Sequence, residues 1–431
     1  MIEVTPYNTA VNPATTKKSV RDLRVMILYG WESNPYAEST TRALLARGVN
    51  VDLVTRTGSQ RSGNEQNCTL HPLFPGHRHG RSPVRMLFLE IIALARVLRL
   101  VLKTRPDIIH YQSYRMIRLD WILFLLLRLI GKKIVFTVHD TDSLEASAFD
   151  SYIFARTARR SDLLLVHNSN ARRVVVERWK VSPGRIRVIP HGGYEHYYPR
   201  LMHKSAARFD LGYTNEFLLL AFGTVRQYKG LDYLLPALAQ ARRRIPEPRL
   251  IIAGRAFDPA LGRRYEQQIV ELGLADIVRF ENRFIEEPEV ERFFTAADLV
   301  VLPYVRIDQS GVLFLAYTFA RPVLGTSVGG LPELIREGVS GYLVPPRDST
   351  ALSEGIVKAW NERHRLSEMG SNARRLIEEE YTWERQADIT LDAYLRLLGR
   401  DGHGAAGHDD SPASDRRASP DGRGSHPSSV R

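Results

Sequence analysis

The 431-residue sequence has a single cysteine, Cys68, and no long run of apolar residues. One cysteine excludes a disulfide framework within the chain and a zinc site built from thiolates, and it is typical of a reducing compartment. The two longest apolar stretches, 86–102 and 121–130, are interrupted by arginine and fall short of the roughly 20 apolar residues of a membrane span. Residues 1–21 lack the apolar segment of a signal peptide and predict a disordered leader. We therefore expect a cytoplasmic protein.

Negative charge is in deficit, because 60 Lys and Arg oppose 48 Asp and Glu, for a formal net charge of +12. The basic excess lies in 76–105 and 150–200, which favours an anionic partner, although solubility alone explains it equally well. The sequence carries no RRM, KH or helix-turn-helix pattern, so we expect no nucleic-acid partner. Segment 84–103 is apolar with interspersed arginines, which favours peripheral association with an anionic membrane surface. The alternative is a core helix whose arginines reach solvent.

Apolar segments that end in glycine open two similar halves of the chain, one at Arg24 and one at Phe217. In each half, continuous apolar runs alternate with amphipathic segments, which predicts a parallel sheet covered by helices on both faces. The expected strands are 24–30, 51–55, 107–111, 133–138, 162–166 and 186–189 in the first half, and 217–223, 249–254, 277–280, 299–302, 322–325 and 341–344 in the second. The expected fold class is therefore α/β, with two doubly wound Rossmann-like domains that face a ligand-binding cleft.

The expected domain boundaries follow from a break in the pattern near residue 195 and from composition. We place the first domain at 22–195 and the second at 196–375. A C-terminal helix at 376–400 is expected to pack back on the first domain. Residues 401–431 are rich in Gly, Ser, Pro, Asp, Arg and His and predict a disordered tail.

The turn after strand 217–223 has the strongest local pattern for an anion site. Gly223 ends the strand and Thr224 and Arg226 follow it. A helix is expected to begin near Lys229. Backbone N–H groups and the dipole of a helix N-terminus favour an anion there, and the two cationic side chains would hold a diphosphate. The alternative is an ordinary turn with a solvated lysine.

Three further turns of the second half are assigned to the same donor-binding site. Ser310 and Gly311 follow Gln309 and open an apolar helix, where serine is a good N-cap and glycine lets a ligand approach the backbone. Glu333 follows a Gly-Gly turn at another helix start, where it either caps that helix or faces the nucleotide. Gly254 ends the strand 249–254 and completes the set.

The first half places polar side chains at strand exits. The strand that ends at residue 138 delivers His139, Asp140 and Asp142 as candidates for a general base or for contacts to a sugar. A structural role for the histidine is the alternative. The candidates for acceptor binding lie after the first strand and at the junction of the two halves: Trp31, Asn34, Tyr36, His191 and Gly192. The junction residues are alternatively a simple hinge turn.

Taken in order, these segments resemble the GT-B glycosyltransferases of family 4 and their near relatives. The resemblance covers roughly residues 22–398 and rests on 139–140, 190–192, 222–232, 296–303 and 329–333, with Gly338 and Gly341 following. It implies that the second domain binds a nucleotide-diphosphate sugar and that the first domain binds the acceptor. It also implies that Lys229 meets the diphosphate and that Glu333 lies near the nucleotide. Members of the family usually need no metal, and we expect no metal and no other cofactor.

The sequence departs from the family pattern at three positions. Thr224 stands where an arginine usually follows the strand-ending glycine, and Arg226 is the expected substitute. Ile307 and Leu315 stand where the family has a pair of glutamates. These apolar side chains bind neither a ribose nor a sugar, so a retaining mechanism is not implied. An inverting enzyme needs a base beside the acceptor hydroxyl, and an aspartate after strand 133–138 would serve.

We therefore expect a hexosyltransferase that moves a hexose from a nucleotide sugar to a glycan or to a polyprenyl-linked or glycolipid acceptor. Surface polysaccharide or glycolipid assembly is the expected setting, by analogy alone. Three alternatives stay open: a sugar-nucleotide epimerase, a protein that binds a sugar nucleotide without turnover, and a basic polyanion binder that is not an enzyme.

Overall fold

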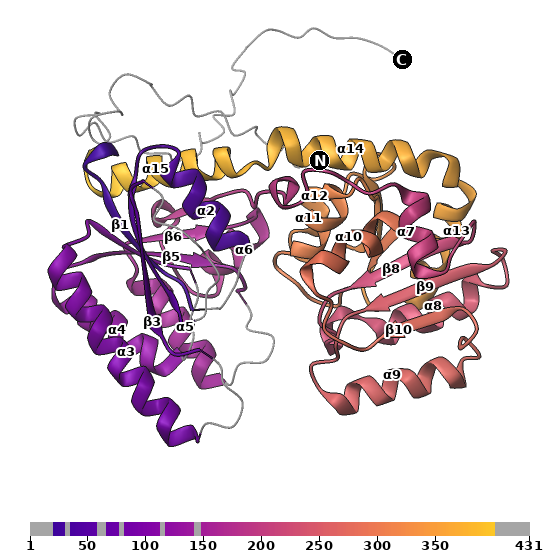
Figure 1. Ribbon diagram of the computed structural model, residues 1–431, viewed down its shortest axis with the longest axis horizontal. Helices are drawn as coiled ribbons and strands as arrows, with labels where there is room; N and C mark the ends of the chain where they lie inside the picture. The colour runs from indigo at the N-terminus through magenta and orange to yellow at the C-terminus, as the bar shows by residue number, and fades with distance from the viewer. Residues whose placement is uncertain are drawn as a thin grey trace, which may run out of the picture.

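The computed structural model describes residues 20–30, 35–57, 66–76, 82–112, 117–141 and 148–400. Within these residues the chain forms two α/β domains side by side, each with a wholly parallel sheet between helices (Figure 1). Most strands are short runs of Val, Ile, Leu and Phe that are buried on both faces, as sheets covered on both sides require. The expected α/β class with two Rossmann-like domains is confirmed.

The first sheet has, in the described part of the chain, seven strands in the order β3-β2-β1-β4-β5-β6-β7. The strands are β1 (Arg24–Leu28), β2 (Asn50–Arg56), β3 (Cys68–Phe74), β4 (Ile108–Tyr111), β5 (Lys133–Val138), β6 (Leu163–Val166) and β7 (Ile186–Val188). The helices are α2 (Pro35–Leu45), α3 (Pro83–Thr104), α4 (Ile117–Leu129), α5 (Ala148–Arg160) and α6 (Ser169–Glu177). Strand order reverses between β1 and β4, and such a reversal leaves a crevice at the carboxyl ends of the strands.

The second sheet has six strands, counted over residues 148–400, in the order β10-β9-β8-β11-β12-β13. The strands are β8 (Phe217–Phe222), β9 (Pro248–Ala253), β10 (Val278–Glu281), β11 (Leu299–Leu302), β12 (Val323–Thr326) and β13 (Gly341–Val344). The helices are α7 (Lys204–Leu211), α8 (Leu231–Ala241), α9 (Pro259–Glu271), α10 (Glu287–Ala296), α11 (Gly311–Thr318), α12 (Leu331–Leu334) and α13 (Ser349–Asn361). The order reverses between β8 and β11, which places the crevice of this domain beside those two strands.

Strand β3 is absent from the set of strands expected from the sequence. It lies at the edge of the first sheet, contains Pro72 and is only partly buried. An edge strand tolerates proline and polar residues, so it lacks the continuous apolar run that identifies the buried strands. The other strands end within two residues of the expected positions, as is usual at element ends.

Two long helices at the end of the described chain bridge the domains (Figure 1). Helix α14 (Leu366–Glu380) packs on α11 and β13 of the second domain, and α15 (Trp383–Leu397) packs on α2 and β6 of the first. The boundary expected after residue 375 falls inside α14 and is wrong. The helix continues because Leu376 and Ile377 are buried, and the chain crosses between the domains at 381–382.

Helix α15 completes the first domain through buried polar contacts. Gln386 Nε2 donates to the hydroxyl of Tyr36 at 3.0 Å. The hydroxyl of Tyr394 lies 2.6 Å from Nδ1 of His110. Among the helices of the described residues, none combines the length and the apolar character needed to cross a bilayer.

Candidate active site at the domain cleft

Lys229 lies at the carboxyl end of β8, in a tight turn before α8. The turn is a short 3-10 helix, Gln227–Lys229, and α8 begins at Leu231, so the lysine precedes the helix instead of opening it. Gly230 follows with φ of 74°, and a Cβ there would overlap the carbonyl group of Pro303. Only glycine accommodates both the left-handed conformation and this close approach. The turn therefore directs Lys229 back toward the end of β8.

The ammonium group of Lys229 is enclosed by protein atoms. Its Nζ donates to the carbonyl oxygen of Phe222 at 3.2 Å and to the hydroxyl of Tyr304 at 3.3 Å. Burial lowers the pKa of Lys229; Tyr228 opposes this shift and Arg226 adds to it. An anion bound at Nζ would oppose this shift, because an opposite charge favours the ammonium form. The lysine is thus arranged to bind phosphate oxygens.

Tyr304 connects Lys229 to the N-terminus of α11. Its hydroxyl also lies 3.5 Å from Oγ of Ser310, which is buried. Ser310 is the N-cap of α11 and accepts a hydrogen bond from the N–H of Leu313 at 3.3 Å. Gly311 is the first residue of the helix. The positive end of α11 therefore lies beside the lysine, an arrangement that suits an anion.

An open pocket borders the Lys229 turn at the carboxyl ends of β8, β9 and β10. It encloses about 1080 Å³ of space open to solvent. The lining residues are Phe222, Gly223, Thr224, Ala253, Gly254, Arg255, Ala256, Phe257, Pro259, Phe284 and Ile285. Gly223 and Gly254 have φ of 94° and 148°, and a Cβ on Gly254 would come within 2.3 Å of the carbonyl oxygen of Gly223. Glycine at both positions keeps this part of the pocket free of side chains.

Two phenylalanines that the sequence analysis missed lie on the walls of this pocket. Phe257 is 60% exposed and Phe284 is 63% exposed. Exposed rings on a pocket wall offer flat surfaces for a ring of a ligand. The guanidinium of Arg226 lies 3.7 Å from the centre of the Phe257 ring, so Arg226 borders the pocket as well as the lysine. The sequence could have pointed to Phe257 as a pocket residue, because this aromatic residue comes three positions after Gly254, which ends the expected strand.

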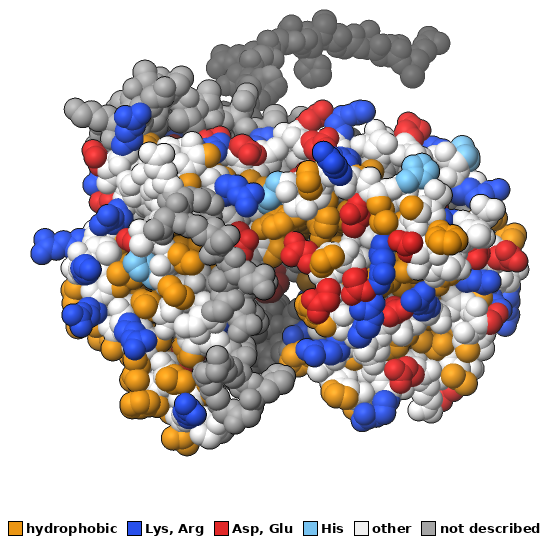
Figure 2. Space-filling model, in the orientation of Figure 1, with side chains coloured by type: hydrophobic (Ala, Val, Ile, Leu, Met, Phe, Trp, Pro, Cys, Tyr) orange, Lys and Arg blue, Asp and Glu red, His pale blue; other side chains and the backbone are white. Residues whose placement is uncertain are grey.

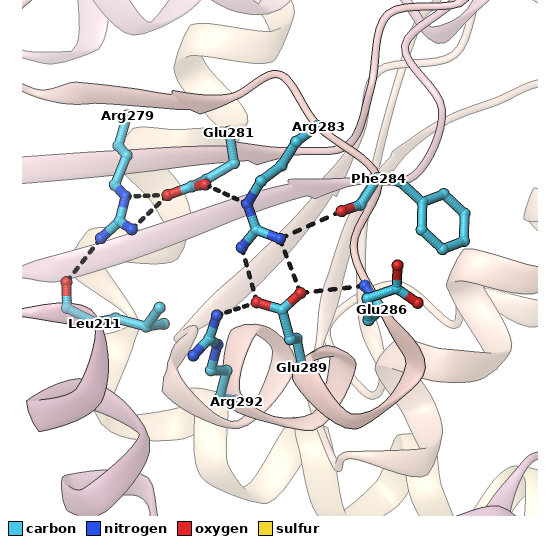
Figure 3. Close-up of polar contacts among 8 residues, drawn as sticks. All are labelled: Leu211, Arg279, Glu281, Arg283, Phe284, Glu286, Glu289 and Arg292. Atoms are coloured by element: carbon cyan, nitrogen blue, oxygen red, sulfur yellow. Dashed lines mark hydrogen bonds and ion pairs between the residues drawn. The ribbon is translucent and has the colours of Figure 1, made fainter.

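The loop that carries Phe284 is held by a network of ion pairs (Figure 3). Arg283 makes two hydrogen bonds of 2.8 Å to the carboxylate of Glu289 and one of 3.0 Å to Glu281. It also donates to the carbonyl oxygen of Phe284 at 3.2 Å. The carbonyl of Glu281 in turn accepts from the N–H of Gly254 at 3.0 Å. These contacts fix the wall of the pocket to its floor.

His139 follows β5 on the opposite side of the cleft. Its Nδ1 lies 3.1 Å from Nε2 of His167, and the ring of Tyr36 packs edge-on at 4.7 Å. Burial lowers the pKa of His139 to about 4, so the imidazole is neutral at pH 7. His139 therefore offers hydrogen bonds to a ligand and no positive charge.

Asp140 is the next residue and is open to water in the cleft, with both domains around it. Enclosure by the two domains raises the pKa of Asp140 to about 7; Asp308 contributes to the increase and Arg306 opposes it. A carboxyl group with this pKa exchanges a proton near neutral pH, which is the property that a general base needs.

The loop before α11 binds the first domain directly. The carboxylate of Asp308 accepts a hydrogen bond from the N–H of Thr141. Asn168, at the start of α6, donates to the carbonyl oxygen of Asp308 at 2.8 Å and to Oε1 of Gln309 at 3.3 Å. Gln309, expected to bind the donor, therefore lies at the contact between the domains.

Glu333 also contacts the first domain. Its Oε1 accepts hydrogen bonds from the N–H groups of Ser169 at 2.9 Å and Asn170 at 3.3 Å. These are the first two residues of α6, so Glu333 caps a helix of the other domain. The sequence offered a cap of its own helix or a contact to the nucleotide, and the structure shows this third arrangement.

Two residues of the expected acceptor-binding set, Tyr36 and His191, lie together with ring centres 5.2 Å apart, but both are buried. Tyr36 is 3% exposed and His191 is 6% exposed, with the His191 ring stacked on Phe314 at 4.5 Å. Gly192 packs so closely on Trp383 that a Cβ would lie 2.4 Å from its ring. Packing on α11 and α15 buries Tyr36, His191 and Gly192, and their assignment to the acceptor site stays a prediction. The candidates Trp31, Asn34 and Asp142 lie outside the described residues.

Two family models match this chain, and together they cover most of both domains. Glycosyltransferase Family 4 matches residues 34–192, and Glycosyl transferases group 1 matches residues 216–362. The chain belongs to the family 4-like glycosyltransferases of the GT-B fold. The resemblance read from the sequence is confirmed, and the alternatives that are not glycosyltransferases are set aside.

Curated relatives of this glycosyltransferase have related activities. A D-inositol 3-phosphate glycosyltransferase of Stackebrandtia nassauensis is 27% identical over 85% of this chain and 87% of that protein. The O-antigen chain mannosyltransferase C of Escherichia coli is 31% identical over 49% of this chain and 53% of that protein. The enzyme class is therefore established, whereas the names of the two relatives point to different acceptors.

Solved structures share the fold of this glycosyltransferase. A sucrose-phosphate synthase of Thermosynechococcus elongatus superposes with a TM-score of 0.71 at 21% identity, over 88% of this chain and 99% of that one. HepE of Anabaena, in complex with UDP and glucose, has a TM-score of 0.68 at 20% identity, over 86% and 98% of the two chains. At these identities the likeness establishes the two-domain fold alone.

The structure shows how the three residues that depart from the family pattern are placed in this glycosyltransferase. Ile307 and Leu315 are partly buried and pack against the hydrophobic core, as apolar residues do. Thr224 is exposed on the pocket wall.

In the described part of the chain, no three His, Cys, Asp or Glu side chains are grouped so as to hold a metal ion. The expectation that the enzyme needs no metal stays a prediction.

Proposed function

We propose that this glycosyltransferase moves a hexose from a nucleotide-diphosphate sugar to a glycan or lipid-linked acceptor. The observation that carries the proposal is the enclosed Lys229 next to an open pocket at the carboxyl ends of β8, β9 and β10. A cation at a helix N-terminus suits a diphosphate. Exposed rings on the adjoining pocket suit the nucleoside attached to it.

In this proposal Lys229 and Arg226 stabilise the leaving diphosphate. Bond cleavage at the anomeric carbon leaves negative charge on the diphosphate oxygen. Lys229 Nζ is held by hydrogen bonds to Phe222 and Tyr304, so little reorganisation is needed when that charge develops. The nucleoside extends into the pocket between Phe257 and Phe284.

Asp140 is the proposed base on the other side of the cleft. The acceptor hydroxyl oxygen forms the new bond to the anomeric carbon, the bond from that carbon to the diphosphate breaks, and the hydroxyl proton passes to Asp140. A pKa near 7 lets the carboxylate accept that proton at neutral pH. His139 supplies a neutral hydrogen-bonding group for the donor sugar or the acceptor.

A lipid-linked acceptor is supported by the outer face of the first domain. Val84, Phe88 and Leu129, on the neighbouring helices α3 and α4, are 78%, 62% and 84% exposed. Hydrophobic and basic side chains gather over these helices, at the lower left of Figure 2. Apolar side chains mixed with arginines favour a position on an anionic membrane surface. Surface polysaccharide or glycolipid assembly at the inner face of the membrane is the proposed setting.

Nucleotide binding tests the donor part of the proposal. Thermal unfolding is measured with UDP, GDP, ADP and TDP, for the natural chain and for Lys229→Ala. A ligand at about 100 times its dissociation constant stabilises a protein by roughly 2.7 kcal/mol. For a chain of this size we expect a shift of a few degrees with one nucleotide. UDP is tried first, because HepE is described in complex with UDP.

The matched control is Lys103→Ala, which removes an exposed lysine of α3 and is expected to keep the whole shift. The nucleotide that stabilises the natural chain identifies the base of the donor. Loss of its shift in Lys229→Ala, but not in Lys103→Ala, supports the proposal. If no nucleotide stabilises the protein and heparin does, the donor site is misassigned and the basic surface becomes the binding site.

Vesicle flotation tests the membrane part separately. We expect binding to vesicles of phosphatidylglycerol, weaker binding to phosphatidylcholine, and loss of binding in Phe88→Ser. The control is Phe209→Ser on α7, another exposed phenylalanine that lies in the second domain. Equal behaviour of the two variants would reject the α3–α4 surface.

A further inference from the structure

Two acidic side chains from different domains lie together in the cleft. Asp140 follows β5 of the first domain, and Asp308 lies in the loop between β11 and α11 of the second. The carboxylate of Asp308 accepts a hydrogen bond from the N–H of Thr141, the residue directly after Asp140. The two carboxyl groups are thus held near one another by a bond between the domains.

Further hydrogen bonds hold Asp308 in place. Its carbonyl oxygen accepts from Asn168 Nδ2 at 2.8 Å and from the N–H of Gly330 at 3.0 Å. Asn168 is itself fixed as the N-cap of α6, where its Oδ1 accepts from Ala171 at 2.8 Å. Asp308 is therefore anchored to both domains at once, and its position depends on the domains being together.

The charged and titratable groups around Asp140 come mostly from the second domain. Among the described residues these are Asp308, Arg306 and the phenol of Tyr228, beside the neighbouring His139. His139 is neutral at pH 7, and Arg306 opposes the effect of Asp308. Asp308 is the group whose negative charge opposes ionisation of Asp140.

We propose that Asp308 is a positioning residue for Asp140: it holds the Asp140–Thr141 turn against the donor-binding domain and sets a second negative charge beside the candidate base. The role of this pair in catalysis rests on the proposed function. The pairing itself rests on the contacts across the domains.

The consequence is a base that is completed by domain closure. Two neighbouring carboxylates repel, so one of them retains a proton more strongly than it would alone. Because the second charge comes from the other domain, Asp140 gains proton affinity when the domains meet and loses it when they separate. The carboxylate that faces the acceptor therefore accepts a proton best when the donor domain is in place.

Titration of Asp140 in the full chain tests this inference without an acceptor. The chain is labelled with aspartate carrying ¹³C at the carboxyl carbon, and the signal of Asp140 is identified by its absence in Asp140→Asn. We expect this signal to titrate near pH 7. In Asp308→Asn, which keeps an oxygen to accept from Thr141, we expect its pKa to fall by about one unit, a tenfold loss of proton affinity.

The matched control is Asp348→Asn, which neutralises the carboxylate that caps α13 away from the cleft. It is expected to leave the Asp140 titration unchanged. An Asp140 signal that titrates in the ordinary carboxyl range, or that Asp308→Asn leaves in place, overturns the inference. Failure of nucleotides to stabilise the protein would overturn the donor proposal and leave the carboxylate pairing standing, so the two failures are distinguishable.

Discussion

The two domains share one architecture, but they place opposite chemistry at the cleft. The second domain presents Lys229, Arg226 and the positive end of α11. The first domain presents Asp140 and the neutral imidazole of His139. Inverting glycosyl transfer needs stabilisation of a negative leaving group on one side of the sugar and a proton acceptor on the other. Under the proposed function, the second domain binds the donor and the first domain carries the proton acceptor.

The domains differ in their cores as well. The first domain is completed by α15, which comes from the other end of the chain and makes a buried bond to His110. The first domain also buries His167 beside Tyr36, and the partly exposed His139 packs against the same tyrosine ring. The second domain holds its sheet with helices from its own part of the chain. Acid, and substitutions that break contacts between distant segments, should therefore lower the stability of the first domain more than that of the second.

The largest expected effect is on turnover in Lys229→Ala. The substrate is a sugar nucleotide with the base identified by the thermal shift, and its cleavage should slow by about 100-fold or more. One preorganised hydrogen-bond donor at a developing negative charge contributes about 10²–10³ to the rate. Release of the nucleoside diphosphate is the measurement. Lys103→Ala should cleave at the natural rate, and an equal loss in both variants would remove the special role of Lys229.

Asp140→Asn tests the role of the first domain in the comparison. Transfer should slow by about 100-fold, since a positioned base contributes about 10²–10⁴. The thermal shift with nucleotide should stay as in the natural chain, because the diphosphate is held by the other domain. Loss of nucleotide binding in this variant would place Asp140 on the donor side and contradict the division of roles.

Stability should decline as pH falls below about 6.5, chiefly through the buried histidines. Burial lowers the pKa of His110 to about 3 and that of His139 to about 4, whereas the unfolded chain titrates near 6.5. The unfolded state therefore binds protons first as pH falls, and each histidine removes up to about 1.4 kcal/mol of stability per pH unit.

Urea unfolding at pH 7, 6 and 5 measures this slope. His110→Gln should flatten the slope, whereas the exposed His364→Gln should leave it unchanged. A slope that is the same in all three chains would mean that burial of His110 does not govern acid stability.

The smallest expected effect is that of Tyr394→Phe. The hydroxyl of Tyr394 is 2.6 Å from Nδ1 of the buried His110, and its removal leaves that nitrogen without this partner. We expect a loss of about 1–3 kcal/mol in the free energy of unfolding. Tyr233→Phe is the control, because within the described residues its hydroxyl makes no hydrogen bond to another side chain or to the backbone. A neutral result for Tyr394→Phe would show that α15 is held by apolar packing alone.

Much of the donor side could be predicted from the sequence, because its signals are local. A strand that ends at Gly223, a lysine in the next turn and a serine at the start of α11 occupy a few consecutive positions each. Their chemistry follows from the backbone around them. The pocket walls with Phe257 and Phe284 were missed, because an exposed phenylalanine in a loop has no distinctive local pattern.

The first-domain side was harder to predict, because burial there depends on distant segments. Tyr36 and His191 look like loop and hinge residues in the sequence, but Trp383, Gln386 and Phe314 cover them. Glu333 and Gln309 likewise contact residues of the other domain that are distant in the sequence. No short pattern records which side chain from a remote element will occupy a given site.

The sequence by itself determined the α/β class, the two domains, the position of most strands along the chain and the turn that carries Lys229. These features follow from hydrophobic period, glycine and helix-start residues, which act over neighbouring positions. Only the tertiary structure decided that Asp308 lies against the Asp140 turn, that Glu333 caps α6 and that the hydroxyl of Tyr394 on α15 meets His110. Those contacts join residues far apart in the chain, and they form only where two complete surfaces fit.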